Sequence, residues 1–171
     1  MAEASTNAIT QLKNDHNLFR ALLSKLEETS ENAKKTRHTL FAELKRELVA
    51  HATLEEEFLY PAVEEAADEE HAEDLKHSYE EHHVVDVLLD ELTILKVDDE
   101  AWGAKVHVLR ENLVHHIKEE EEELFPYAQS IIEATELDEL GLDMADRRDE
   151  ALEQAEAAKD LNTQAKPIEK R

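Results

Sequence analysis

This chain of 171 residues contains no cysteine, only two glycines and three prolines, and aromatic residues make up only 5% of it. The absence of cysteine excludes disulfides, iron–sulfur clusters and zinc sites built from thiolates. Glycine and proline are the residues that most disfavour a helix interior, so their scarcity favours long uninterrupted helices. The length suits a single domain.

Basic residues are also scarce, since 19 lysines and arginines face 43 acidic residues and give a formal net charge of -24. Such a surface repels nucleic acids and anionic lipids, which are therefore poor candidate partners, and it attracts cations. No apolar run approaches the roughly 20 residues of a membrane span. The first residues lack the basic start and apolar core of a signal peptide. We expect a cytoplasmic protein that is a monomer or a weak homo-oligomer.

Two stretches of the chain carry the same pattern, a histidine, a run of acids and a proline ten residues after the histidine. HATLEEEFLYP begins at His51 and HIKEEEEELFP begins at His116, and a glutamate follows each histidine by four residues, at Glu55 and Glu120. Residues four apart on a helix lie on one face. Each stretch therefore presents an imidazole and a carboxylate on the same side, and both groups are good ligands for a metal ion.

The repeat extends upstream to a second kind of histidine, preceded in both copies by an acid. His16 lies 35 positions before His51, and His82 lies 34 positions before His116. The chain thus reads as two copies of one unit, a helix with one histidine followed by a helix with His-x-x-x-Glu. Two copies predict a closed structure, because a solenoid needs more repeats.

Apolar residues spaced three and four apart predict four long helices, with a histidine on the apolar stripe of each. The predicted helices cover about residues 7–31, 36–67, 69–96 and 100–134. The histidines lie at similar distances from the turns, so at ~1.5 Å per residue they should share one height. We predict an all-α fold, an antiparallel up-down four-helix bundle of two repeated αα-hairpins.

This bundle should occupy residues 1–134. Residues 135–171 are charged and alanine-rich, and we expect a fifth helix or arm that is partly disordered from Leu161 onward and carries no chemistry.

The whole layout resembles the hemerythrin-like, or HHE cation-binding, domain over about residues 9–132. The resemblance implies a four-helix bundle with two iron ions in an oxo- or hydroxo-bridged centre, which binds dioxygen, nitric oxide or peroxide or senses iron. It also implies that the two glutamates bridge the irons. The metal ligands carried over by motif are His16, His51, Glu55, His82, His116 and Glu120.

One position departs from the oxygen-carrying members of the family, which have two histidines four apart on the third helix. Here Ser78 stands four residues before His82, and Asp86 stands four residues after it. The missing histidine disfavours reversible oxygen carriage. It leaves water, Asp86 or Tyr79 to complete the coordination shell of the metal at this helix. The other acids of the two glutamate runs should be surface residues. The remaining histidines should lie at the surface or behind the ligands: His38, His71, His77, His83, His107 and His115.

Ligand type alone also allows manganese or zinc. A ferritin-like centre is disfavoured because it uses Glu-x-x-His, and a zinc hydrolase because HExxH is absent. Three classes of function stay open: a module that binds or senses a diatomic ligand, an enzyme that handles peroxide or nitric oxide, and a structural metal site without turnover.

Overall fold

The computed structural model describes residues 7–164, and every regular element in that range is helical, as predicted. No helix within this range is both long and apolar enough to span a membrane. The elements are α1 (Ala8–Glu27), α2 (Lys34–Leu54), the π-helical η1 (Glu55–Leu59), α3 (Tyr60–Ala66), α4 (Glu69–Ile94), α5 (Glu100–Glu119), the π-helical η2 (Glu120–Leu124), α6 (Phe125–Ile131) and α7 (Ala134–Gln164).

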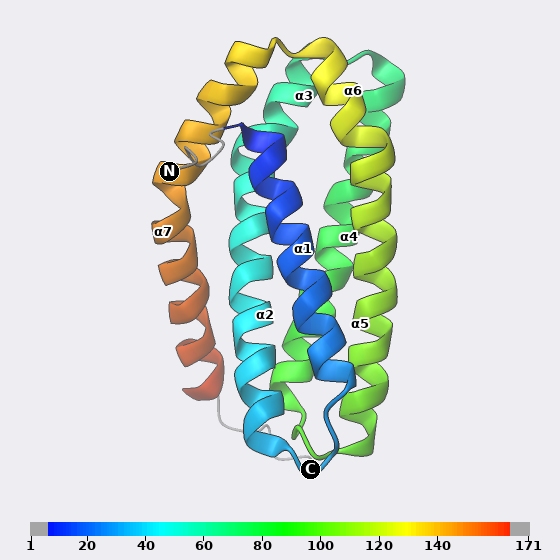
Figure 1. The fold of residues 1–171 in the computed structure, drawn as a ribbon, viewed down its shortest axis with the longest axis vertical. Helices are drawn as coiled ribbons and strands as arrows, with labels where there is room; N and C mark the ends of the chain where they lie inside the picture. The colour runs from blue at the N-terminus through cyan, green and yellow to red at the C-terminus, as the bar shows by residue number, and fades with distance from the viewer. Residues whose placement is uncertain (1–6, 165–171) are drawn as a thin grey trace, which may run out of the picture.

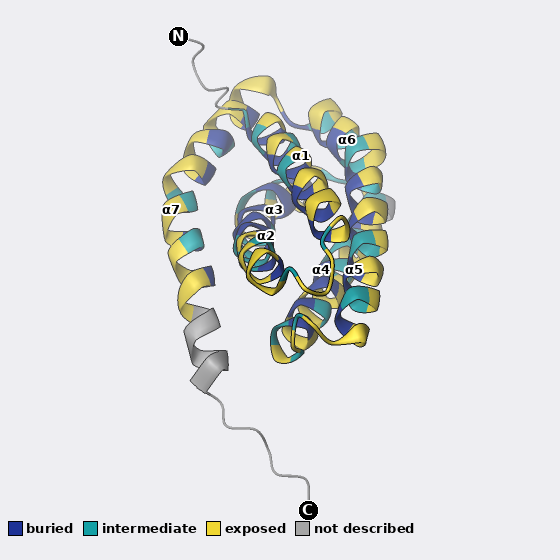
Figure 2. Ribbon diagram, turned by 60° about the horizontal axis from the view of Figure 1, so that its bottom comes forward, coloured by how far each residue is buried: buried dark blue, intermediate teal, exposed yellow. Residues whose placement is uncertain are grey.

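The long helices α1, α2, α4 and α5 lie side by side (Figure 1). Helix α1 packs against α2 and α5, and α4 packs against α5 and α2, so the four helices close around a common interior. Helix α7 stands outside this group and packs along α2 and α1. Figure 2 shows that buried residues follow the inward faces of the helices while exposed residues cover the outer faces, which is the pattern expected from apolar stripes spaced three and four apart.

The apolar core forms two clusters, one toward each end of the helices. Phe19, Leu48 and Val85 belong to one cluster, together with Trp102. Leu12 belongs to the other, with residues of α3, α6 and α7. The polar stripe residues lie between the two clusters, for example His16 between Leu12 and Phe19 on α1. Burying a large apolar side chain contributes about 1.5–3 kcal/mol, so the two clusters stabilise the helices on both sides of a costly polar layer.

A buried arginine joins the two turns at one end of the molecule. Arg37 donates hydrogen bonds to the hydroxyl and carbonyl oxygens of Thr29 and, at 2.8 Å, to the carbonyl oxygen of Val97. Its guanidinium also lies 5.2 Å from the ring centre of Trp102. These bonds tie the α1–α2 turn to the α4–α5 turn, which keeps the two hairpins in register.

The second and fourth predicted helices are each interrupted by a π-helical turn that the sequence analysis did not predict. In an uninterrupted α-helix, Pro61 would lack the N–H that bonds the carbonyl of Glu57 and would clash with it. Instead the Tyr60 N–H donates to the carbonyl of Glu55, five residues back. The same arrangement recurs before Pro126. The prolines thus lie in the first turn of α3 and α6, and the chain continues as a helix beyond the π turn.

The C-terminal segment is a helix in the described part of the chain. Helix α7 buries Leu137, Met144, Ala151 and Ala155 against the bundle. Residues 161–164 still belong to α7, and the rest of the segment expected to be disordered lies outside the described residues.

Candidate metal centre

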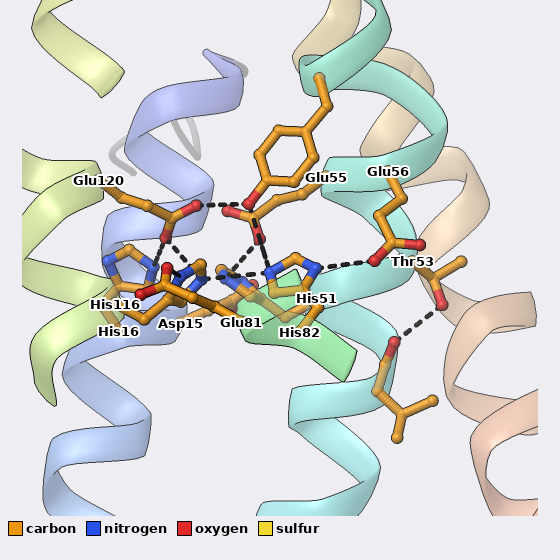
Figure 3. Close-up of polar contacts among 12 residues, drawn as sticks. Asp15, His16, His51, Thr53, Glu55, Glu56, Glu81, His82, His116 and Glu120 are labelled. Carbon is orange, nitrogen blue, oxygen red and sulfur yellow. Dashed lines mark hydrogen bonds and ion pairs between the residues drawn. The ribbon is translucent and has the colours of Figure 1, made fainter. Parts of the chain in front are cut away.

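The structure brings the six sequence-predicted ligands together in one buried layer. Four histidines come from four different long helices, and the two glutamates are the first residues of η1 and η2. Figure 3 shows the two carboxylates above a row of four imidazole rings. None of these side chains is more than 7% exposed: His16, His51, Glu55, His82, His116 and Glu120.

The six residues form two overlapping groups of possible metal ligands. One group adds His16 and His51 to the two glutamates, and the other adds His82 and His116 to the same two glutamates. Within each group the candidate ligand atoms all lie within 4.8 Å of one another. Both carboxylates are therefore available to both groups, which is the arrangement that two neighbouring metal ions require.

Each carboxylate faces one histidine of either group. Glu55 Oε2 lies 3.2 Å from His51 Nε2 and 3.3 Å from His82 Nε2. Glu120 Oε2 lies 3.2 Å from the Nε2 atom of His16 and 3.4 Å from that of His116. The sequence repeat thus produces a nearly two-fold arrangement of donors.

Several of these atoms make no hydrogen bond within the described part of the chain. They are His16 Nε2, both carboxylate oxygens of Glu55 and Glu120 Oε2. A buried polar atom without a hydrogen bond is costly, and bound cations would satisfy all of these atoms. Two nitrogen and two oxygen donors in each group suit iron, manganese or zinc. The residues present therefore fit a pair of metal ions.

The outward nitrogen of each imidazole bonds a second set of carboxylates. Within each hairpin the acid that precedes the first histidine binds the second: Asp15 Oδ2 accepts from His51 Nδ1 at 3.2 Å, and Glu81 Oε2 from His116 Nδ1 at 2.8 Å. Such bonds fix the ring orientation and the tautomer, so that Nε2 points into the buried layer.

The acid that follows each buried glutamate accepts a hydrogen bond from a histidine of the other hairpin. Glu56 Oε1 accepts from His82 Nδ1 at 2.8 Å, and Glu121 Oε1 accepts from His16 Nδ1 at 2.9 Å. Both acids were expected to be surface residues, and Glu56 is exposed and Glu121 partly exposed, but their bonds to the buried histidines were not predicted. The signal in the sequence was their identical place in the two motifs, directly after the glutamate of His-x-x-x-Glu.

Arginines distinguish the two halves of the centre. Arg148 of α7 makes two bonds to Asp15, at 2.7 and 2.9 Å, and Arg20 makes two bonds to Glu121, at 2.8 and 3.1 Å. In the part of the chain that the structure describes, the ion pairs of Glu56 and Glu81 are with histidines only. The sequence analysis assigned no chemistry to the C-terminal segment, so the role of Arg148 was missed.

A tyrosine hydroxyl also reaches the centre. Tyr60 donates a hydrogen bond to Glu120 Oε1 at 2.8 Å, and its oxygen lies 3.3 Å from His82 Nε2. Its ring stacks on His82, with 5.5 Å between ring centres. Tyr79, the tyrosine favoured by spacing, instead packs edge-on against Tyr60 at 5.1 Å. Asp86, the other protein candidate for that shell, is exposed.

The charges of the cluster shift the pKa values of its members. Burial lowers the pKa of His51, but the carboxylates of Glu55 and Asp15 outweigh it and raise this pKa from 6.5 to about 10. The pKa of His82 is likewise about 10, because Glu55 and Glu56 outweigh burial. Burial raises the pKa of Glu55, yet His51 and His82 hold it well below its usual range. Without metal the layer is held by imidazolium–carboxylate pairs, so a metal ion must displace protons to bind.

The remaining histidines lie away from the centre. His83 and His115 are exposed although each adjoins a buried histidine, so the structure agrees with the predicted register of α4 and α5. His71 is partly buried and stacks on Tyr127 at 3.7 Å between ring centres. The others are exposed: His38, His77 and His107.

A small cavity of about 20 Å³ adjoins three of the inward histidines. That volume exceeds the roughly 10–15 Å³ that one water-sized molecule needs. Its lining is His51, His82 and His116 with Phe19, Leu48, Ala52, Val85, Asp86, Leu113 and Ile117, and is therefore mostly apolar.

Comparisons with known proteins agree with this geometry. The family described as "Hemerythrin HHE cation binding domain" matches residues 7–128. The uncharacterized protein Rv2633c of Mycobacterium tuberculosis is 33% identical over 145 residues, which are 82% of this chain and 84% of that protein. The crystal structure of an HHE domain-containing homolog of Rv2633c from Mycobacterium kansasii superimposes with a TM-score of 0.77 at 28% identity, covering 94% of both chains. A protein named DNA nickase from a Nostoc species is 27% identical over 114 residues, 67% of this chain but only 31% of the relative.

Proposed function

Because the chain belongs to the hemerythrin HHE cation-binding domain family, we propose that its buried layer holds two iron ions within a four-helix bundle made of the two hairpins. Glu55 and Glu120 would bridge the ions, with His16 and His51 on one and His82 and His116 on the other. The observation that carries this proposal is that both candidate ligand groups contain the same two glutamates.

We propose that the ligand of this centre is dioxygen, nitric oxide or peroxide, bound for sensing, storage or detoxification. Bound iron would supply a redox-active ion that can exchange electrons with these ligands. The mostly apolar cavity beside His51, His82 and His116 supports a small ligand of low polarity, because it offers little to bind a charged or extended molecule.

The chain's own residues prepare the site before any ligand arrives. Asp15 and Glu81, like Glu56 and Glu121, hold the outward Nδ1 atoms, so the four Nε2 atoms point inward. The two apolar clusters above and below the layer keep bulk water out, which strengthens every electrostatic interaction inside it.

The Tyr60 hydroxyl favours a second candidate, turnover of peroxide. Decomposition of hydrogen peroxide to dioxygen and water needs proton transfers, and Tyr60 places an O–H group between Glu120 and His82 in the same layer. Burial and the charges of Glu120 and Glu55 raise the pKa of Tyr60 well above its usual range, so the hydroxyl keeps its proton. A hydroxyl that keeps its proton can donate a hydrogen bond to a peroxide bound in this layer.

The DNA activity in the name of the Nostoc relative is not part of the proposal. The match covers only 31% of that relative, and the net charge of -24 disfavours contact with a phosphate backbone.

Metal analysis and an optical spectrum of iron-replete protein test the proposal. We expect about two irons per chain and a visible absorption that changes when the reduced protein meets dioxygen or nitric oxide. Gas evolution from added peroxide would select the enzymatic candidate. Iron without any response to these ligands would leave a structural site. One zinc and no iron after iron-replete expression would refute the di-iron centre.

A further inference from the structure

A second cavity, of about 380 Å³, opens beside α4, α5 and η2 and reaches the buried centre. Its lining includes Glu120, which is 1% exposed, and Glu119 and Glu123, which lie at the surface. Glu120 Oε2 has no hydrogen-bond partner among the described residues. The cavity therefore extends from the outer surface to Glu120, the residue of the buried centre that is part of its wall.

The lining of this cavity suits the passage of a cation. Four of its residues are acids, namely Asp74, Glu119, Glu120 and Glu123, and none is lysine or arginine. Ser78 also lines it, four residues before His82 on the same face of α4. The small side chain of Ser78 leaves room that a larger residue would fill.

A cluster of histidines and acids stands at the outer side of this cavity. The candidate ligand atoms of His77, Glu81 and Glu119 lie within 4.8 Å of one another. His115 joins them, with Nε2 at 3.1 Å from Glu119 Oε1 and 3.8 Å from Glu81 Oε1. The four residues, two from α4 and two from α5, offer two imidazoles and two carboxylates, and the three without His115 have all their candidate ligand atoms within 4.8 Å.

We propose that His77, Glu81, His115 and Glu119 form a surface site that captures a divalent first-row cation, Fe²⁺ for the centre proposed above, and delivers it through the cavity to Glu120. This role rests on the proposed di-iron function. The surface site binds more weakly than the buried centre, because His77 and His115 are exposed and must be ordered by the ion. Weak binding suits a site that must release its ion inward.

Glu81 links the two sites directly. Its Oε1 atom faces His115, while its Oε2 atom accepts the Nδ1–H of the buried His116 at 2.8 Å. For that reason the test leaves Glu81 unchanged and alters only His77 and Glu119, whose side chains make no contact with a buried histidine in any described ion pair.

The first test is a calorimetric titration of iron-loaded, desalted protein with Zn²⁺, with retained iron measured afterwards. We expect one additional ion per chain, and His77→Ala combined with Glu119→Gln should weaken its binding roughly tenfold or more, which is about 1.4 kcal/mol. The matched control is His107→Ala with Glu111→Gln, an exposed His–Glu ion pair on α5 that does not line the cavity. Absence of the additional ion, or equal weakening in the control, overturns the surface site.

The second test follows Fe²⁺ uptake by metal-free protein under anaerobic conditions, measured as protein-bound iron after rapid desalting. His77→Ala with Glu119→Gln should slow uptake roughly tenfold while the final iron content stays at the wild-type level, and Ser78→Leu should slow it by narrowing the cavity. Uptake at the wild-type rate in both variants overturns the delivery route. If the wild-type protein takes up no buried iron, the di-iron proposal fails, and the difference between the Zn²⁺ titrations of His77→Ala with Glu119→Gln and of the matched control still decides the surface site.

Discussion

Arg148 and Asp15, 133 positions apart in the chain, form a paired salt bridge with N–O distances of 2.7 and 2.9 Å. Asp15 Oδ2 also accepts the Nδ1–H of His51, so one carboxylate joins the outer helix α7 to a predicted metal ligand. Burial raises the pKa of Asp15, but the hydrogen bonds and charges of His51 and Arg148 outweigh burial and hold this pKa below its usual value. Asp15 therefore stays ionised. Helix α7 is thus part of the centre's support.

Replacing Arg148 by Ala should therefore weaken metal binding, although Arg148 touches no metal ligand itself. Loss of a residue that orients a metal ligand typically lowers metal affinity 10–100-fold. Arg148 acts on His51 through Asp15, so we expect its loss to lower the affinity about tenfold or less. Loss of the charge-assisted bonds should also lower the melting temperature. The measurement is competition with a chelator, alongside thermal unfolding. Arg147→Ala is the matched control, because its carboxylate partner on η1 is the outward Glu57. Equal effects of both variants on affinity would contradict the role of Arg148.

The six buried residues should differ sharply from the exposed histidines. Replacement of His16, His51, His82 or His116 by Ala should abolish binding of at least one iron. Glu55→Gln and Glu120→Gln should reduce occupancy at both positions together, because each carboxylate faces both groups.

Iron content per chain after loading measures this difference. His38→Ala and His107→Ala serve as controls, since both side chains are exposed, and both should retain the wild-type iron content. If His83→Ala removed iron while His82→Ala did not, the ligand assignment on α4 would be wrong.

Besides the two arginines, the halves of the centre differ by one hydroxyl, which Tyr60→Phe would remove. Tyr60 stacks on His82, and its counterpart in the second motif, Phe125, stacks on His16 at 5.6 Å. We expect the variant to fold and keep two irons, at a cost of about 0.5–1.5 kcal/mol for the lost hydrogen bond. Its optical spectrum and its rate with peroxide should change, because a proton donor has left the site. Tyr79→Phe is the control, and an equal change in that variant would exclude a specific role for Tyr60.

The meeting of the six candidate ligands in one layer could be predicted from the sequence because α-helical periodicity relates each of them to an apolar stripe. His51 and Glu55, four residues apart, precede the π turn, so the α-helical rule holds for them. Tyr60 lies nine residues after His51, which is about half a turn away at ~100° per residue. The π turn at η1 absorbs one extra residue and rotates Tyr60 back toward the layer. A prediction that assumes the α-helical period along the whole helix cannot place Tyr60 in the layer. The spacing on α4 favoured Tyr79 instead.

The supporting residues were harder to predict for a different reason. Glu56 and Arg148 bind residues on other helices. Periodicity predicts only which face of its own helix a residue lies on, so it does not predict these contacts. Glu56 reaches His82 on α4, and Arg148 reaches Asp15 on α1. The internal repeat did carry part of the information, since acids occupy equivalent places beside each ligand in both copies.

Removal of the metal should lower the melting temperature. A ligand present at about 100 times its dissociation constant stabilises the folded state by about 2.7 kcal/mol. For a domain of this size each kcal/mol corresponds to roughly 2–4 °C. We therefore expect a decrease of at least about 5 °C on chelation at neutral pH, measured by circular dichroism with the iron content determined in parallel. Identical melting temperatures with and without iron would contradict a link between binding and folding.

The effect of metal removal should grow as the pH rises. In metal-free protein the folded-state pKa values of His51 and His82 are raised from 6.5 to about 10, through Glu55 with Asp15 for His51 and with Glu56 for His82, against burial. A raised pKa means that the folded state binds the proton more tightly, so this stabilisation is complete below about pH 6.5 and is lost between about pH 6.5 and pH 10.

Iron displaces the same protons, so the stability of the iron-loaded protein should stay nearly constant over that window while the metal-free protein loses stability. Thermal unfolding of both forms at pH 6.5, 7.5 and 8.5 measures the difference, which should widen at each step. Glu55→Gln removes the carboxylate that both histidines share, so the metal-free variant should show a shallower decline than the metal-free wild type. A metal-free melting temperature that rises across this window would show that protonated His51 and His82 do not replace the metal's charge in the buried layer.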